Sequence, residues 1–286
     1  MHKVLTFLCG MLSLMAQAQM NAPAQPAQRI VALAPHITEL LFAAGAGAQV
    51  VGTVAYSDYP EEAKKIPRIG DYNSVQIESI MRLKPDLIIA WPGKALTAQL
   101  QKLEKLGFTV LYSDPQTPQQ VADNIRWFGQ LSGHAEYAAQ QAAEFLQHWQ
   151  TIAQKYAGLH PVRVFYQVWS DPLMSLNKDS VIHHAISVCG GINIFADANV
   201  PVPQVNIEAV VRDNPDVIIS AGETASAATM LQWRKWQNMT ATRFNQFYVI
   251  SGDDISRPTP GILVGVEKLC QYLDQARTKI YPQLKP

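Results

Sequence analysis

Short apolar runs alternate with amphipathic segments along most of this 286-residue chain. In the first half, RIVALAP, VVGTVAY, DLIIAW and FTVLYSD have the character of buried strands, whereas HITELLFAAG and LTAQLQKLEKLG place apolar residues at helical spacing before a glycine. The second half repeats this alternation with RVFYQVW, SVIHHAISVCGG, DVIISAG and FYVISGD. Strands that alternate with helices at this spacing predict an α/β fold with parallel sheets.

The region between the two halves has a helical pattern and no strand. From about residue 118 to 159, apolar residues recur every three or four positions. We therefore predict two similar α/β lobes with parallel-type sheets, joined by one long helix, with a ligand cleft between the lobes. The predicted ranges are 29–130 for the N-terminal lobe, 131–160 for the connecting helix and 161–286 for the C-terminal lobe.

One segment of the sequence occurs twice. IESIMRLKPDLIIA begins at Ile77 and IEAVVRDNPDVIIS begins at Ile207, so each lobe contains the same helix–strand unit. Glu78 and Glu208 are therefore equivalent positions, expected on the same exposed edge of their lobes. Glutamate is favoured in the first turn of any helix because it complements the macrodipole. Two equivalent carboxylates are also a suitable pair of ligands for paired arginines on a partner.

Residues 1–18 have the layout of a cleavable secretory signal. A basic start precedes an apolar run of about twelve residues, and Ala16 and Ala18 form a small-x-small ending. A membrane anchor is the alternative, but a helix that spans a bilayer needs about 20 apolar residues. We therefore expect a signal peptide, a periplasmic location and no membrane insertion.

The cysteines of the mature chain form one possible pair. Removal of the signal peptide would delete Cys9 and leave Cys189 and Cys270 in an oxidising compartment. A disulfide is the expectation, and two buried free thiols are the alternative.

Charge and motif content argue against several functional classes. The 23 Lys and Arg residues balance the 23 Asp and Glu residues, so the chain has no net positive charge that would favour binding to nucleic acid. The sequence contains no GxSxG elbow, P-loop, GxGxxG motif or HExxH motif, so we expect no enzymatic activity and no cofactor or metal site. His36 lies at a strand-to-helix loop, where open α/β sheets bind ligands, although a lone loop histidine is commonly just solvated.

Aromatic residues gather at the predicted strand-to-helix loops. Any single one can close the edge of the core, but together they indicate the wall of a ligand cleft. The loop SGDDISRP, after the last predicted strand, adds polar groups on the same side. The aromatic candidates are Tyr56, Tyr59, Tyr72, Trp91 and Trp169, and the polar candidates are Asp253, Asp254 and Arg257.

Several contiguous, correctly ordered segments resemble the periplasmic substrate-binding proteins with a helical backbone. They are RIVALAPHITELLFAAG, VAYSDYP, IESIMRLKPDLIIAW, VCGGINIF, VPVPQV and IEAVVRDNPD, and the resemblance covers essentially the whole mature chain. It implies two lobes, a rigid connecting helix and a ligand held in the cleft. It also implies that Glu78 and Glu208 dock on arginines of the permease dimer of an ABC importer.

Within that family, the resemblance is greatest to the members that bind cobalamin. It implies a ligand-binding role for Tyr56, Trp91 and Asp253, whereas Tyr72, Val202 and Asp254 stand where those members have tryptophan. The implied function is capture of cobalamin or a related corrinoid and its delivery to an ABC importer, with no chemistry done. A haem or iron–siderophore binder of the same fold, a metal-ion binder and a nucleotide-dependent enzyme remain alternatives.

Overall fold

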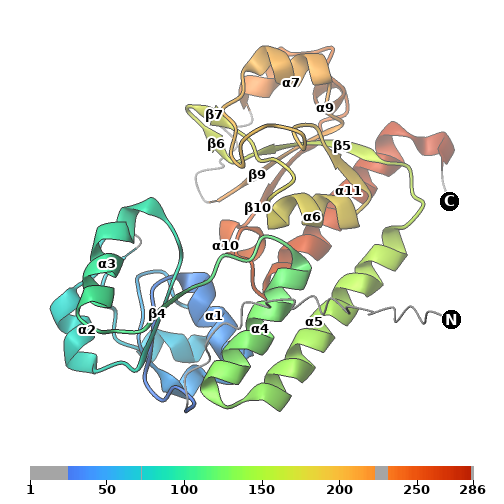
Figure 1. Cartoon of the computed structure of the whole chain (residues 1–286). Coiled ribbons are helices and arrows are strands. Elements are labelled where there is room, and N and C mark those ends of the chain that lie inside the picture. The colour runs from blue at the N-terminus through green and yellow to red at the C-terminus, as the bar shows by residue number, and fades with distance from the viewer. Residues whose placement is uncertain (1–24, 72, 223–230, 285–286) are drawn as a thin grey trace, which may run out of the picture.

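The computed structural model describes residues 25–71, 73–222 and 231–284, which form two α/β lobes connected on one side by helices (Figure 1). Each lobe contains a four-stranded parallel sheet, and the strand orders are β2-β1-β3-β4 and β10-β9-β5-β8. The predicted fold class is therefore confirmed. The predicted signal peptide at 1–18 and Tyr72 lie outside the described residues.

The N-terminal lobe alternates strands with helices. Its first helix begins at Pro35, where the missing N–H costs nothing, and ends before Gly45, whose φ is +86°. The elements are β1 (Ile30–Ala32), α1 (Pro35–Ala43), β2 (Val50–Gly52), α2 (Ile77–Leu83), β3 (Leu87–Ala90), α3 (Thr97–Lys105) and β4 (Val110–Tyr112), with 3₁₀ turns at Gly47–Gln49, Glu61–Lys65 and Lys94–Leu96.

The C-terminal lobe repeats this arrangement and adds a two-stranded antiparallel hairpin, β6 with β7. The elements are β5 (Val162–Gln167), β6 (Trp169–Ser170), β7 (Leu173–Met174), α6 (Val181–Val188), β8 (Gly191–Asn193), α7 (Ile207–Asp213), β9 (Val217–Ala221), α9 (Thr240–Arg243), β10 (Phe247–Ile250), α10 (Gly252–Ile255) and α11 (Ile262–Ile280), with 3₁₀ turns at Gln232–Lys235 and Pro282–Leu284.

Both sheets are covered on both faces, which explains why their strands read as continuous apolar runs. Along β3, Leu87 and Ile89 pack into one core cluster while Ile88 and Ala90 pack into another. The first of these clusters is shared by the two lobes, because it also contains residues of β5, β9, α5 and α11. The lobes are thus joined by packing as well as by the chain.

The helical region between the lobes forms two helices. Helix α4 (Pro118–Ser132) begins with a capping box, in which the Thr117 side chain accepts from the backbone N–H of Gln120, and ends at Gly133, whose φ is +83°. Helix α5 (Ala135–Tyr156) then passes from the N-terminal lobe to the C-terminal lobe along one side of the molecule (Figure 1). The glycine in the left-handed region divides the helical stretch that the sequence pattern shows as continuous.

The repeated segment folds in the same way in both lobes, down to its backbone contacts. Helices α2 and α7 both end at a residue in the left-handed conformation, Lys84 and Asn214. In the N-terminal lobe, the Arg29 guanidinium donates to the Leu83 carbonyl at 2.7 Å. In the C-terminal lobe, Arg163 donates to the Asp213 carbonyl at 2.7 Å.

Two aspartates complete these equivalent units. Asp86 accepts from the backbone N–H of Arg29 at 3.0 Å, and Asp216 accepts from the backbone N–H of Arg163 at 2.8 Å. Each side chain ties the strand after the repeated helix to the first strand of its lobe. The repeat in the sequence therefore fixes a local hydrogen-bond arrangement.

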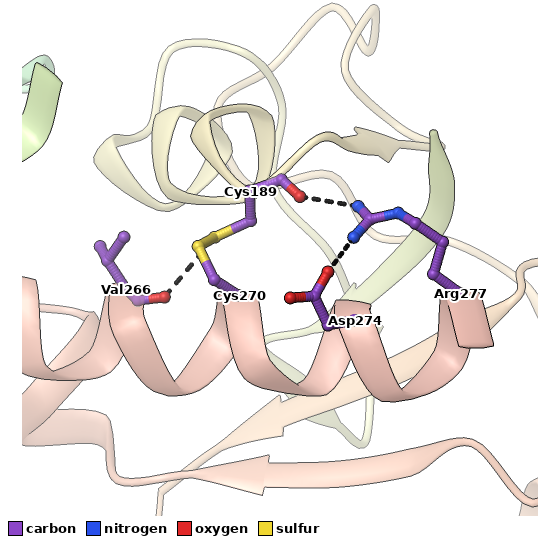
Figure 2. Close-up of a disulfide and its surroundings, with 5 residues drawn as sticks. All are labelled: Cys189, Val266, Cys270, Asp274 and Arg277. Atoms are coloured by element: carbon purple, nitrogen blue, oxygen red, sulfur yellow. Dashed lines mark hydrogen bonds and ion pairs between the residues drawn. A yellow bond between two sulfur atoms is a disulfide. The ribbon is translucent and has the colours of Figure 1, made fainter. Parts of the chain in front are cut away.

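Cys189 and Cys270 form the predicted disulfide, which joins the end of α6 to α11 (Figure 2). Both residues are fully buried. The Arg277 guanidinium, also buried, donates to the Cys189 carbonyl at 2.9 Å and pairs with Asp274 one turn earlier on α11. The C-terminal helix is therefore fixed to its lobe by a covalent bond and a charged hydrogen-bond network.

Candidate ligand-binding site

Two adjoining cavities lie between the lobes, with volumes of about 340 and 580 Å³. Both are lined by residues of the two lobes, so together they form one interlobe cleft. The side chains common to both cavities are those of Trp91, Asp114, Gln116, Ser180 and Ser256.

The cleft lies where parallel strands end, which is where open α/β sheets bind ligands. From the N-terminal lobe, Ala34 follows β1, Trp91 follows β3 and Asp114 lies just after β4. From the C-terminal lobe, Val168 follows β5 and Gly252 follows β10. The two sheets thus direct the same type of edge toward one shared space.

Trp91 is the largest side chain of the cleft wall that the sequence predicted. It is 47% exposed, and its indole N–H donates to Asp114 Oδ1 at 3.0 Å. The amide of Gln116 donates to the same oxygen at 2.6 Å. These two contacts fix the ring orientation and leave about half of the side chain exposed for contact with a ligand.

The charged groups of the cleft have one sign. Asp114 and Asp179 line the two cavities, and among the described lining residues no lysine or arginine accompanies them. His36 is the remaining titratable nitrogen base in the wall. Desolvation lowers its pKa to about 4, so the imidazole is neutral at pH 7.

Tyr166 contributes a buried hydroxyl to the larger cavity. Its residue is 1% exposed, and within the part of the chain that the structure describes its hydroxyl oxygen has no hydrogen-bond partner. Burial raises the pKa of the phenol far above its ordinary value, and the Ser256 hydroxyl lowers it by a smaller amount from a position that does not meet hydrogen-bond geometry. An unpaired buried hydroxyl lowers the stability of the protein by about 1–3 kcal/mol. A hydrogen bond from a ligand in the cleft to this hydroxyl would remove that cost.

Arg257 connects the lobes at the edge of the cleft. Its Nη1 donates to Glu39 Oε1 at 2.6 Å, and its Nη2 donates to the Tyr56 carbonyl at 3.1 Å and to Asp253 at 2.7 Å. The Thr259 hydroxyl donates to the other Glu39 oxygen at 2.7 Å. Glu39, on α1, is buried, and desolvation raises its pKa despite these partners. We call this group of contacts the interlobe clamp.

The predicted ligand residues therefore occupy different places. Trp91 and Val202 line the cavities, whereas Tyr56, Asp253 and Arg257 meet at the interlobe clamp. Three others are outside these contacts. Tyr59 is 60% exposed and lines a different cavity, Trp169 on β6 is 55% exposed and donates to the Asp171 carbonyl, and Asp254 lies on α10.

Sequence reasoning missed most of the polar lining. Asp114 is the last residue of the predicted strand segment FTVLYSD and Gln116 lies two positions later, and Ser180 is the N-cap of α6, where its side chain accepts from the backbone N–H of Ile182. Strand-end and helix-start positions were therefore an available signal. Tyr166 gave no such signal, because a tyrosine within a strand is as compatible with packing in the core as with a place in a ligand site.

Two further searches bear on the class of site. In the described ranges no group of three or more His, Cys, Asp or Glu side chains could hold a metal ion. No helix among the described residues is long and apolar enough to cross a membrane.

Comparison with known proteins gives a consistent result. The family model described as periplasmic binding protein matches residues 30–253. The vitamin B12-binding protein of Vibrio cholerae is 40% identical over 253 residues, which cover 88% of this chain and 91% of that protein. A crystal structure of the periplasmic vitamin B12-binding protein of Vibrio cholerae superimposes with a TM-score of 0.79 at 41% identity, covering 88% of this chain and 98% of that one.

A more distant structure shows the fold alone. The periplasmic haem-binding protein of Roseiflexus sp. RS-1 superimposes with a TM-score of 0.76 at 23% identity, covering 87% of this chain and 99% of that one. The two-lobed architecture, the interlobe cleft and the match over residues 30–253 agree with one another. The chain belongs to the periplasmic binding protein family.

Proposed function

We propose that this chain captures cobalamin or a related corrinoid in the periplasm and delivers it to an ABC importer. The observation that carries the proposal is the interlobe cleft, an apolar wall containing Trp91 with a few polar groups, which suits a large flat ligand rich in amides. The names of the similar vitamin B12-binding proteins support the same ligand. We propose binding without chemistry on the ligand and without a resident cofactor.

The charge of the cleft supports a corrinoid over the alternative ligands. Haem carries two propionates and many ferric siderophores are anionic, so Asp114 and Asp179 would repel them. Corrinoids present neutral amide side chains around the ring, which can accept and donate hydrogen bonds in such a wall. Binding of haem or an iron–siderophore is the alternative function, and it is tested by titration with those ligands.

Titration calorimetry with cyanocobalamin, haemin and a ferric siderophore tests this function. The wild type is expected to bind cyanocobalamin, and Trp91→Ala to weaken binding by about 2–4 kcal/mol because an aromatic anchor of the cleft wall is lost. Asp253→Ala is expected to cost about 1 kcal/mol or less. Trp236→Ala is the matched control, since Trp236 is 37% exposed and lies outside the cleft lining. Binding of haemin without cyanocobalamin would contradict the proposal.

Docking on the permease is assigned to Glu78 and Glu208. Both are exposed in the first turn of equivalent helices, α2 and α7, on different lobes (Figure 1), and neither is ion-paired with a described residue. Each helix directly precedes a parallel strand that ends at the cleft, β3 after α2 and β9 after α7. Helices of parallel α/β units generally run antiparallel to the strands they pack on, so we expect both helix N-termini on the side of the cleft.

A transport assay separates docking from capture. Glu78→Ala and Glu208→Ala are expected to leave ligand affinity unchanged but to impair uptake, since each loses a charge-assisted contact of about 2 kcal/mol or more. Glu136→Ala is the control, because Glu136 is also an exposed first-turn glutamate, on α5. Loss of ligand binding in the glutamate variants of α2 and α7 would refute the docking role.

A further inference from the structure

His36 has the surroundings of a metal ligand, although the described part of the chain contains no cluster that could hold a free metal ion. The residue lies in the first turn of α1 and lines the smaller cavity of the cleft. Its Nε2 is 3.5 Å from the Ser113 carbonyl, and this is the one hydrogen bond that the ring makes to a described residue, so Nδ1 has none there. With the proton on Nε2, the lone pair of Nδ1 is free.

This arrangement matches how proteins orient a histidine ligand. A ligating imidazole usually donates its other N–H to a backbone carbonyl or carboxylate, which fixes the tautomer and ring orientation. A histidine must also be neutral to bind a metal, and the desolvated His36 has a pKa of about 4. At pH 7 no proton has to leave before its nitrogen can coordinate.

A single histidine is sufficient only when the ligand brings the other donors. A tetrapyrrole supplies four equatorial nitrogens, so one axial imidazole completes a site, as in many haem proteins. We propose that His36 is an axial ligand, through Nδ1, to the metal of a tetrapyrrole bound in the cleft. This inference rests on the proposed function, in which that metal is the cobalt of a corrinoid.

The step is a ligand exchange without redox change. In an aqua-cobalt(III) corrinoid, the Co–O bond to water breaks, water leaves and a Co–N bond to Nδ1 forms. No proton is released, since the imidazole is already neutral, and the cobalt remains Co(III). Cyanocobalamin has a tightly held cyanide in place of the water, so the same exchange is blocked.

Visible spectroscopy and calorimetry with aquacobalamin and cyanocobalamin at pH 7 test the proposal. The bands of aquacobalamin are expected to shift on binding to the wild type, and the aqua form to bind at least tenfold more tightly than the cyano form. In His36→Ala, both the shift and the preference are expected to disappear. His148→Ala is the control, because His148 pairs with Glu267 between α5 and α11, outside the cleft.

The outcomes separate this inference from the proposed function. Binding of both cobalamins with no spectral shift, or a shift that persists in His36→Ala, overturns the inference and leaves corrinoid capture intact. If neither cobalamin binds, corrinoid capture has failed, and a haemin titration decides the axial role. If the Soret band of haemin shifts on binding to the wild type but not to His36→Ala, His36 ligates the iron. A shift that persists in His36→Ala, or no haemin binding at all, overturns the axial role of His36. His36→Gln provides the same comparison if the alanine variant does not fold.

Discussion

The interlobe clamp gives the sharpest prediction about stability. Glu39 comes from the N-terminal lobe, and Arg257 and Thr259 come from the C-terminal lobe, more than 200 positions later in the chain. The Glu39 and Arg257 side chains are 6% and 17% exposed, so the pair is largely shielded from solvent. We expect Glu39→Gln to weaken the attachment of one lobe to the other.

The magnitude follows from two opposing effects. Removing one partner of a buried ion pair commonly costs about 3–5 kcal/mol, because the other charge stays buried. Here Arg257 keeps Asp253, and the raised pKa of Glu39 shows that desolvation already offsets part of the attraction. We therefore expect Glu39→Gln to lower the free energy of unfolding by about 2 kcal/mol.

A double-mutant cycle measured by urea unfolding at pH 7 isolates the pair. Glu39→Gln, Arg257→Gln and the double variant are expected to give a coupling energy of about 2 kcal/mol. Asp253→Asn is the control, since this carboxylate is 75% exposed and a surface pair contributes about 1 kcal/mol or less. Additive effects of the Glu39 and Arg257 substitutions would refute the interlobe clamp as a stabilising contact.

Three further predictions concern buried groups. The disulfide separates Cys189 and Cys270 by 81 positions, so Cys189→Ala/Cys270→Ala should lose about 4.5 kcal/mol in urea unfolding by the loop-entropy relation, and an unchanged midpoint would contradict this. The pKa of His36 is 6.5 in the unfolded chain and about 4 in the folded protein, so its contribution to stability is present above pH 6.5 and is lost as the pH falls toward 4. Between pH 7 and 4, the free energy of unfolding should therefore fall by about 3 kcal/mol more in the wild type than in His36→Gln, and equal losses would contradict this. Tyr166→Phe removes an unpaired hydroxyl, so the ligand-free protein should be equally stable or more stable by up to about 1 kcal/mol. A lower melting temperature of this variant would show that the hydroxyl is paired.

The repeat shows how far local sequence information reaches. The two copies at Ile77 and Ile207 predicted equivalent helices, and the structure gives α2 and α7 the same left-handed caps. A short helix, its cap and the following buried strand depend mainly on neighbouring residues, so their pattern can be read from the chain. The equivalent contacts of Arg29 and Arg163 could not be read in this way, because each joins segments about 50 positions apart.

The cleft shows where such reasoning stops. Trp91 was predicted from its place after a strand, and it lines both cavities. Asp114 was missed, although it orients that ring, because its role depends on a contact across the sheet edge. Arg257 was predicted as a ligand residue, and the structure shows its guanidinium already bonded to both lobes.

The sequence by itself determined the two α/β lobes and the duplicated helix–strand unit, and its cysteine content made the disulfide the expected pairing. Periodicity, caps and composition are properties of neighbouring residues, and burial of apolar runs follows from them. Only the tertiary structure decided which polar groups meet between the lobes, including the pairing of Glu39 with Arg257, and which groups are desolvated, including His36. The physical reason is that desolvation and hydrogen bonding depend on the groups that surround a side chain in space, and distant segments supply those groups.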